Sequence, residues 1–147
     1  MVEHTEYIQL AFEKIIQTRA YTSIILKSRA NPTENIHEKD FALYVDPAVG
    51  QALQRLLTKE ESARPQTHDL ISSIFLGYSV RLKQVVITDL QETTFFARLF
   101  LEQEKDSFRQ ILEIDARPSD CIILAFMHNA PIFCARHVLE KAIAYVE

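Results

Sequence analysis

Two short segments place charged side chains next to a proline, each just before an apolar run. The segments are residues 64–69, RPQTHD, and residues 115–120, DARPSD. Each holds an arginine followed by a proline, then a hydroxyl residue and an aspartate. Charged groups beside a buried helix are costly unless they are paired or used. We therefore predict that the two segments work together as one functional unit.

These segments carry side chains that can bind a divalent cation and transfer a proton. Asp69, Asp115 and Asp120 offer carboxylate oxygens, which are the ligands that Mg²⁺ and Mn²⁺ prefer. A histidine side chain titrates near neutral pH, so His68 is a candidate general acid or base. We predict these four residues as the catalytic group, with the three aspartates as the metal ligands.

Both segments also offer groups that bind an anion. Arg64 and Arg117 each present a planar guanidinium that can fork onto two oxygens of a phosphate. Thr67 and Ser119 are predicted N-caps of two helices, whose first N–H groups point toward any anion bound there. These four residues are the predicted substrate-binding groups, provided that the two segments lie side by side.

The same residues also have a purely structural interpretation. A carboxylate in the first helical turn, as at Asp69 and Asp120, stabilises the helix by ~0.3–1 kcal/mol without any catalysis. Ion pairs between Arg64 and Asp120, or between Arg117 and Asp69, could tie the two helix starts together. His68 would then be a capping or pairing histidine. The remaining histidines lack the spacing typical of a zinc site.

Composition limits the class of protein. The chain has 147 residues, of which 48% are hydrophobic and 24% charged, and its net charge is −4. These values predict a single globular domain over residues 1–147 rather than a disordered chain. A protein that grips nucleic acid through many phosphates usually carries a basic excess. The acidic balance therefore indicates at most a weak, local contact with nucleic acid.

Targeting signals and thiols bear on the compartment. Residues 1–6 are acidic and lack the basic start and apolar block of a signal peptide. No apolar run reaches the ~18–20 residues that span a bilayer. Cys121 and Cys134 both lie in apolar runs and are predicted to be reduced, buried thiols. We expect a cytoplasmic protein that does not enter a membrane.

Residue patterns predict an α+β fold with a mostly antiparallel or mixed sheet. Alternating and β-branched runs predict strands at residues 7–12, 21–26, 41–45, 80–88, 94–102, 108–115 and 130–135. Three to four helices are predicted, after Asp46-Pro47, after Thr67, over residues 119–127 and over residues 138–146. The helix at 119–127 is apolar nearly all round, so we expect it to be buried between layers.

Some of these assignments have alternatives. The first strand also fits helical spacing through Ile8, Phe12, Ile15 and Ile16. Asp46 is predicted to cap a helix, while Gly77 and Asn129 are predicted to end helices in the left-handed conformation. The broad apolar face of the last helix could pack on the sheet or form a dimer contact.

The strand–helix junctions point to an internal repeat. Residues 43–47, LYVDP, echo residues 112–118, which also run from a strand through an aspartate to a proline. A β-β-α duplication would explain the echo. Independent selection of aspartate and proline as helix-start residues would explain it equally well.

Several segments resemble the bifunctional nuclease (BFN) domain family in order and spacing. They are residues 64–70, 86–90, 94–97, 114–122 and 130–133, and the resemblance covers about residues 20 to 140. The resemblance implies an α+β domain that self-associates, as a dimer. Some plant members are described as nucleases acting on both DNA and RNA. It therefore implies a nuclease, and the side-chain chemistry described above adds the expectation that it is metal-assisted and uses Mg²⁺ or Mn²⁺.

The chain departs from the family pattern at two places. Residues 46–50, DPAVG, stand where the family usually has a glutamate, and residues 127–129, MHN, stand where it often has Arg-Thr-Gly. A carboxylate and a basic group are thus replaced. The alternative to a nuclease is a non-catalytic module of the same fold that binds a ligand or a protein and has a regulatory role.

Overall fold

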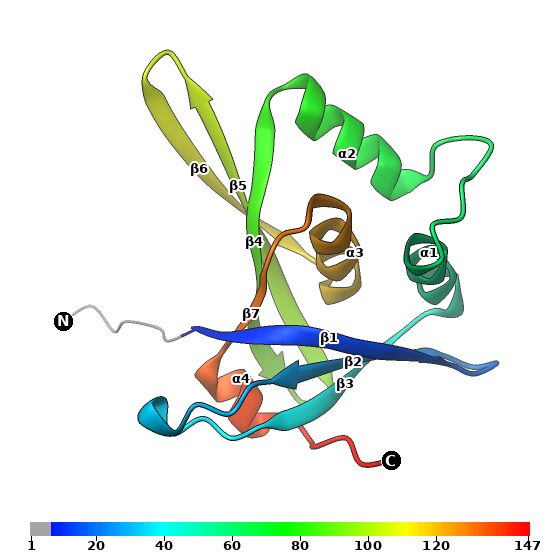
Figure 1. The fold of residues 1–147 in the computed structure, drawn as a ribbon, viewed down its shortest axis with the longest axis vertical. Helices are drawn as coiled ribbons and strands as arrows, with labels where there is room; N and C mark the ends of the chain where they lie inside the picture. Colours follow the sequence, from blue (N-terminus) through cyan, green and yellow to red (C-terminus); the bar gives the residue numbers. More distant parts are fainter. Residues whose placement is uncertain (1–6) are drawn as a thin grey trace.

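The predicted strands form one seven-stranded sheet (Figure 1). The structure is a computed structural model that describes residues 7–147, so the predicted lack of a signal peptide at residues 1–6 lies outside the described residues. The strands are β1 (Tyr7–Gln17), β2 (Thr22–Ser28), β3 (Lys39–Val45), β4 (Val80–Gln91), β5 (Thr94–Lys105), β6 (Phe108–Ala116) and β7 (Ile132–Ala135). Their order is β3-β2-β1-β7-β4-β5-β6, and the mixed sheet confirms the predicted fold class.

The sheet consists of two three-stranded meanders joined by a short central strand. β1, β2 and β3 pair antiparallel in one meander, and β4, β5 and β6 in the other. β7 lies between them, antiparallel to β1 and parallel to β4. Each meander is followed by a helix that begins at a proline, α1 (Pro47–Leu57) and α3 (Pro118–His128). The echo between the two junctions thus has a structural counterpart, with three strands per unit instead of two.

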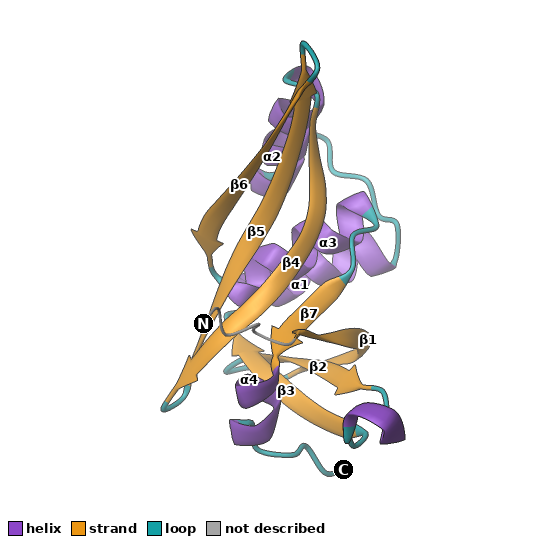
Figure 2. Cartoon of the chain, turned by 90° about the vertical axis from the view of Figure 1, so that its left-hand side faces the viewer, coloured by secondary structure: helices purple, strands orange, loops and turns teal. Residues whose placement is uncertain are grey.

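Three helices cover one face of the sheet. α1, α3 and α2 (Thr67–Gly77) lie on the same side of β4, behind the strands in Figure 2. α3 packs on β4 and β5 and is flanked by α1 and α2, so the predicted burial of this helix is confirmed. An all-apolar helix needs cover on every side, and its neighbours supply it. Over residues 7–147, no helix is long and apolar enough to cross a membrane.

The first apolar segment is a strand, so its helical alternative is wrong. Ile8 and Leu10 are buried while Tyr7 and Gln9 are exposed, which is the period of two expected for a strand. A register shift after Phe12 marks a bulge against β2. A bulge changes the phase of the alternation, which explains why the isoleucines further along also fit helical spacing.

Two predicted helix ends differ from the structure. Gly77 stays helical, and the left-handed conformation falls on Ser79, with φ 54°, because the bend into β4 comes directly before that strand. Asp46 is the N-cap of α1, but its side chain makes no capping hydrogen bond. At the end of α3, Asn129 has a φ of 52° and confirms the prediction.

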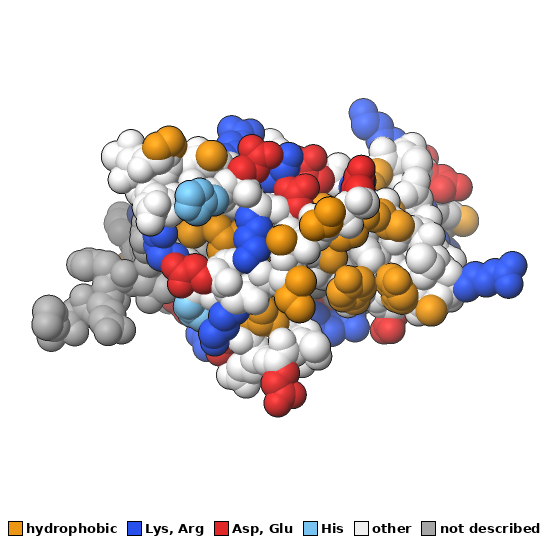
Figure 3. Space-filling view, turned by 90° about the horizontal axis from the view of Figure 1, so that it is seen from below, with side chains coloured by type: hydrophobic (Ala, Val, Ile, Leu, Met, Phe, Trp, Pro, Cys, Tyr) orange, Lys and Arg blue, Asp and Glu red, His pale blue; other side chains and the backbone are white. Residues whose placement is uncertain are grey.

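The C-terminal helix is shorter than predicted. α4 (Arg136–Lys141) ends early, and the chain then extends so that Ala144 forms a bridge with Phe41 of β3. The first half of the predicted helix packs on the sheet, as one alternative expected, whereas Ile143 is exposed. Figure 3 views the molecule from below, and hydrophobic side chains gather there between charged ones. The second alternative, a dimer contact, therefore concerns only the end of the chain.

Candidate functional site

The two proline-marked segments meet in space. His68 lies in the first turn of α2 and Asp120 in the first turn of α3. His68 Nε2 lies 2.9 Å from Asp120 Oδ1, within hydrogen-bond distance. Both side chains are partly buried. Helix packing thus joins residues that are 52 positions apart in the chain.

Arg117 completes a three-residue cluster around the Asp120 carboxylate. Its Nε donates to Oδ2 at 2.8 Å, and its Nη2 donates to Oδ1 at 3.2 Å. Partial burial raises the pKa of Asp120, but the hydrogen bonds and positive charges of Arg117 and His68 outweigh it and lower the pKa below its ordinary value. Asp120 is therefore ionised at neutral pH. The hydrogen bond to Asp120 in turn raises the pKa of Arg117.

The ion pairs predicted between the segments are wrong. Asp120 pairs with Arg117 of its own helix instead of Arg64, because the two side chains are three residues apart on one helix turn. Asp69 does not pair with Arg117. Its Oδ2 accepts from the backbone N–H of Gln66 at 2.7 Å, which caps the start of α2.

Each predicted N-cap lies one or two residues after the observed N-cap. Gln66 is the N-cap of α2, and Thr67 is already the first helical residue. Arg117 is the N-cap of α3, and Ser119 lies inside the first turn, where it is buried. The proline at the first helical position of α3 fixes the boundary, since its φ suits a helix and it has no backbone N–H that would need an acceptor.

The two remaining site residues lie apart from the cluster. Arg64 is exposed on the segment between α1 and α2, where its carbonyl accepts from the side-chain amide of Gln66. Asp115 is exposed near the end of β6 and pairs in register with Arg98 of β5. Neither side chain is placed in the cluster, so their predicted roles remain predictions.

The carboxylates as arranged do not fit a divalent cation. Both oxygens of Asp120 accept hydrogen bonds, and Asp69 Oδ2 is used in the helix cap. Among residues 7–147, no three Asp, Glu, His or Cys side chains gather closely enough to hold a metal ion. A Mg²⁺ or Mn²⁺ site would need several free oxygens pointing at one spot. Asp120 and one oxygen of Asp69 are therefore already used in helix-start contacts, and Asp115 lies apart from them.

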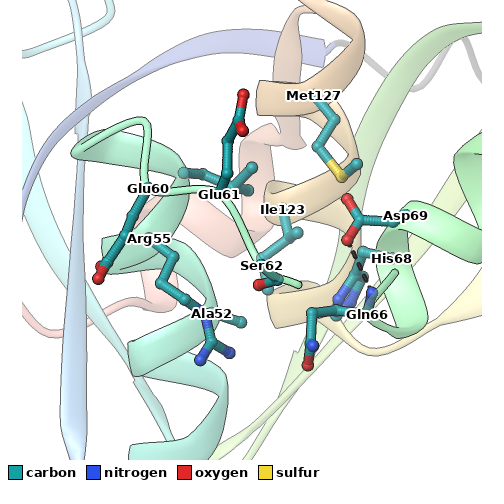
Figure 4. Close-up of a pocket in the computed structure, with 11 residues that line it drawn as sticks. Ala52, Arg55, Glu60, Glu61, Ser62, Gln66, His68, Asp69, Ile123 and Met127 are labelled. Carbon is teal, nitrogen blue, oxygen red and sulfur yellow. Dashed lines mark hydrogen bonds between the residues drawn. The ribbon is translucent and has the colours of Figure 1, made fainter. Parts of the chain in front are cut away.

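A hollow of about 310 Å³ opens on one side of the cluster, between α1, α2 and α3. His68 lines it, together with Arg55 of α1 and Ser62 of the connecting segment. Figure 4 shows that the carboxylates of Glu60 and Glu61 point in different directions, away from each other. Among residues 7–147, His68 Nδ1 has no hydrogen-bond partner. This nitrogen is available to accept a proton.

A second hollow, the tyrosine hollow, opens beside Arg117 and measures about 480 Å³. Its lining includes Tyr21, Tyr44, Asp46, Phe95, Arg117 and Ser119. The tyrosines and Phe95 were not predicted as site residues. Alternation along β3 could have indicated Tyr44, because it places this side chain opposite the buried Leu43. Only the sheet pairing brings β5 to the same hollow.

A further contact between α2 and α3 was also missed. Ser72 Oγ lies 3.0 Å from His128 Nε2, one helical turn beyond His68 on α2. Burial lowers the pKa of His128, so its imidazole is neutral at neutral pH. Phe75 packs against the same ring at a centroid distance of 5.7 Å. We assign this histidine to helix packing.

Both cysteines are free and buried, as predicted. Burial raises the pKa of Cys121 to about 12, with smaller contributions from the charges of Asp120 and Asp115. Burial likewise raises the pKa of Cys134 to about 12. A thiol in this state is a poor nucleophile at neutral pH. Neither cysteine is therefore a candidate nucleophile.

Fold and site together define an α+β domain in which two helix starts bring an arginine, an aspartate and a histidine into contact. Residues 24–147 match the bifunctional nuclease domain, so the chain belongs to that family. It is similar to two proteins of Mycobacterium tuberculosis, the uncharacterized protein MT1877 (strain CDC 1551 / Oshkosh) and the uncharacterized protein Rv1829 (strain ATCC 25618 / H37Rv). Each is 32% identical over 115 residues, which is 76% of this chain but 66% of the relative, just under two thirds.

Proposed function

We propose that this protein cleaves phosphodiester bonds of DNA or RNA, with His68 as the general base. The observation that carries the proposal is the contact of 2.9 Å between His68 Nε2 and the ionised Asp120. A carboxylate that accepts from one ring nitrogen fixes the tautomer, so the proton sits on Nε2 and the lone pair on Nδ1. Membership of the nuclease domain family supports the choice of reaction.

The proposed step uses only side chains of the cluster. A water molecule attacks phosphorus while its proton passes to His68 Nδ1, and the bond from phosphorus to the leaving oxygen breaks. That oxygen takes a proton from solvent, and the imidazolium of His68 then releases its proton to solvent, so charge and protons balance. Asp120 stays ionised and stabilises the imidazolium. The Nη1 group of Arg117, which has no partner among residues 7–147, neutralises charge on the phosphate.

A regulatory binding module is the second candidate. Both oxygens of Asp120 already contact His68 or Arg117, and these contacts connect the starts of α2 and α3. A purely structural role of Asp120 would need the same contacts, which favours this candidate. The net charge of −4 also disfavours tight binding to nucleic acid. A module of this kind would bind an anionic ligand or a protein without changing it.

The purified protein is expected to cleave labelled single-stranded DNA or RNA in the presence of a chelator. The physical reason is that the proposed base is an imidazole and that both oxygens of Asp120 already accept hydrogen bonds from Arg117. The assay compares single- and double-stranded DNA and RNA with Mg²⁺, with Mn²⁺ and with the chelator. Cleavage that requires Mn²⁺ or Mg²⁺ would restore the metal-assisted mechanism predicted from the sequence. Absence of cleavage under all conditions would favour the binding module.

We propose a second copy of the chain as a partner, paired through β6. Strand β6 ends the sheet, and all of its residues except Ala116 are exposed. An uncovered edge strand with apolar side chains tends to pair with another strand. A two-fold antiparallel pairing centred on Ile111 would place Phe108 opposite Ile114 and Arg109 opposite Glu113. Apolar and opposite-charge pairs across strands both stabilise such an arrangement.

Replacing Ile111 with lysine is expected to weaken self-association at least about tenfold, which corresponds to ~1.4 kcal/mol. Two lysines would face each other on the two-fold axis. Ile111 is 52% exposed, so the monomer keeps its fold. Sedimentation equilibrium of Ile111→Lys and of Ile143→Lys, a matched change at the C-terminal end, measures the effect. Dissociation by Ile143→Lys alone would move the interface to the C-terminal segment.

The compartment that we propose is the cytoplasm. The two free, buried thiols support a reducing environment.

A further inference from the structure

The tyrosine hollow combines two exposed aromatic rings with a positively charged wall. Tyr44 is 68% exposed and Tyr21 43% exposed, although both are large and partly apolar. Their rings stand edge to face, with centroids 5.4 Å apart and planes at 85°. Each ring thereby holds the other in position. Among the lining residues, Phe95 adds a third aromatic side chain, which stacks on Phe41 at 5.9 Å.

The opposite wall of the hollow carries groups that bind an anion. α1 and α3 both begin here, and neither has a side-chain hydrogen bond capping its first N–H groups. Arg117 lines the same wall and keeps Nη1 free of partners within residues 7–147. Ser119 is only 5% exposed, lines the hollow, and its hydroxyl has no hydrogen-bond partner in the described part of the chain. No buried side-chain oxygen of the described residues lacks a hydrogen-bond partner, so this hydroxyl reaches the open space of the hollow, where it can donate to an anion.

Charge in the hollow restricts the ligand further. Asp46 also lines it, and its carboxylate faces the same guanidinium, since its charge contributes to the raised pKa of Arg117 after the larger effect of Asp120. One arginine balanced by a nearby aspartate suits a single phosphodiester better than a triphosphate. The aromatic wall suits the flat face of a nucleobase, which stacks regardless of base identity.

We infer that the tyrosine hollow binds one nucleotide of a single strand, with its base on Tyr44 and its phosphate against Arg117 and Ser119. A duplex keeps its bases stacked inside and cannot offer one to the hollow. The inference rests on the proposed function, because Arg117 and His68 contact the same Asp120 carboxylate, so that a phosphate bound at Arg117 lies across this carboxylate from His68. It assigns single-stranded nucleic acid as the substrate class.

Replacing Tyr44 with leucine is expected to weaken binding of a single-stranded oligonucleotide by about 5- to 150-fold, the range for loss of one base–aromatic stack. Binding is measured by fluorescence anisotropy of a labelled single-stranded DNA of about twelve nucleotides, within the range of ~4–16 that an OB fold covers, in chelator and low salt. The His68→Ala background is used to suppress cleavage. Tyr44→Phe keeps the ring and should bind as the parent does. Tyr78→Leu is the matched control, since Tyr78 is 71% exposed but lies outside the hollow.

Equal affinities for Tyr44→Leu and Tyr78→Leu would overturn the inference, and so would equal affinities for the single strand and its duplex. Failure of the proposed function has a different signature. In that case wild-type protein leaves the oligonucleotide intact on a gel, while Tyr44→Leu still binds it more weakly than Tyr78→Leu. Loss of binding in Ser119→Ala, with normal unfolding behaviour, would additionally support the placement of the phosphate against Ser119.

Discussion

Replacing His68 with alanine is expected to lower the rate of phosphodiester cleavage by about 10²- to 10⁴-fold, the usual contribution of a general base. The protein should stay folded, because Asp120 keeps its two hydrogen bonds to Arg117 and no buried charge loses its only partner. The rate constant on a labelled single strand, measured under single-turnover conditions, gives the effect. Circular dichroism and urea unfolding verify the fold.

His137→Ala is the matched control for this experiment. His137 also contacts an aspartate, Asp89, at 3.3 Å, but it lies in the first turn of α4, away from the starts of α2 and α3. Its removal should leave cleavage unchanged. Equal losses in His68→Ala and His137→Ala, or no loss in either, would remove His68 from the mechanism.

Asp120→Asn tests the role of the carboxylate in the same assay. An asparagine amide can donate to His68 Nε2, which would move the ring proton to Nδ1 and block that nitrogen as a base. We therefore expect a loss comparable to that of His68→Ala. A fully active Asp120→Asn protein would mean that the cluster only holds the helices together.

Replacing Gly50 with alanine is expected to lower the free energy of unfolding by about 3 kcal/mol, as overpacking in a tight site does. An alanine Cβ at this position of α1 would lie 2.0 Å from Thr22 Oγ1 and 2.6 Å from Thr22 Cβ. Thr22 is buried in β2, and its branched side chain is stiff at χ1, so it cannot move aside. Urea unfolding at pH 7 measures the change.

Gly77→Ala is the control, since these are the two glycines of the chain. Gly77 is also helical, but an added Cβ meets nothing within 4 Å. Alanine there should stabilise the protein by ~0.5–1 kcal/mol through helix propensity. If Gly50→Ala were as stable as wild type, α1 could not lie against β2 as described.

Local patterns in the chain were enough to predict most of the fold. Alternation and β-branched residues predict each strand, because a half-buried strand must alternate and a fully buried one must be apolar. The all-apolar helix at 119–127 predicts its own burial. Helix ends were predicted less well, as at Thr67 and Gly77, because neighbouring donors and the next strand decide the last residue.

The candidate site shows the limit of the sequence. The residue types and the existence of two charged helix starts are readable from residues 64–69 and 115–120. The ion-pair partners of these residues cannot be read from the sequence. An ionised side chain pairs with the opposite charge that tertiary packing places within a few ångströms of it. Packing of α2 on α3 brought His68 to Asp120, and the turn of α3 brought Arg117.

The tyrosine hollow depended on tertiary structure throughout. Its walls come from the turn after β1, the end of β3, the start of β5 and the starts of α1 and α3. Sequence alone determined that these segments are strands and helices with polar ends. Strand order and helix packing, which depend on contacts between residues distant in the chain, decided that Tyr44 and Arg117 face one space.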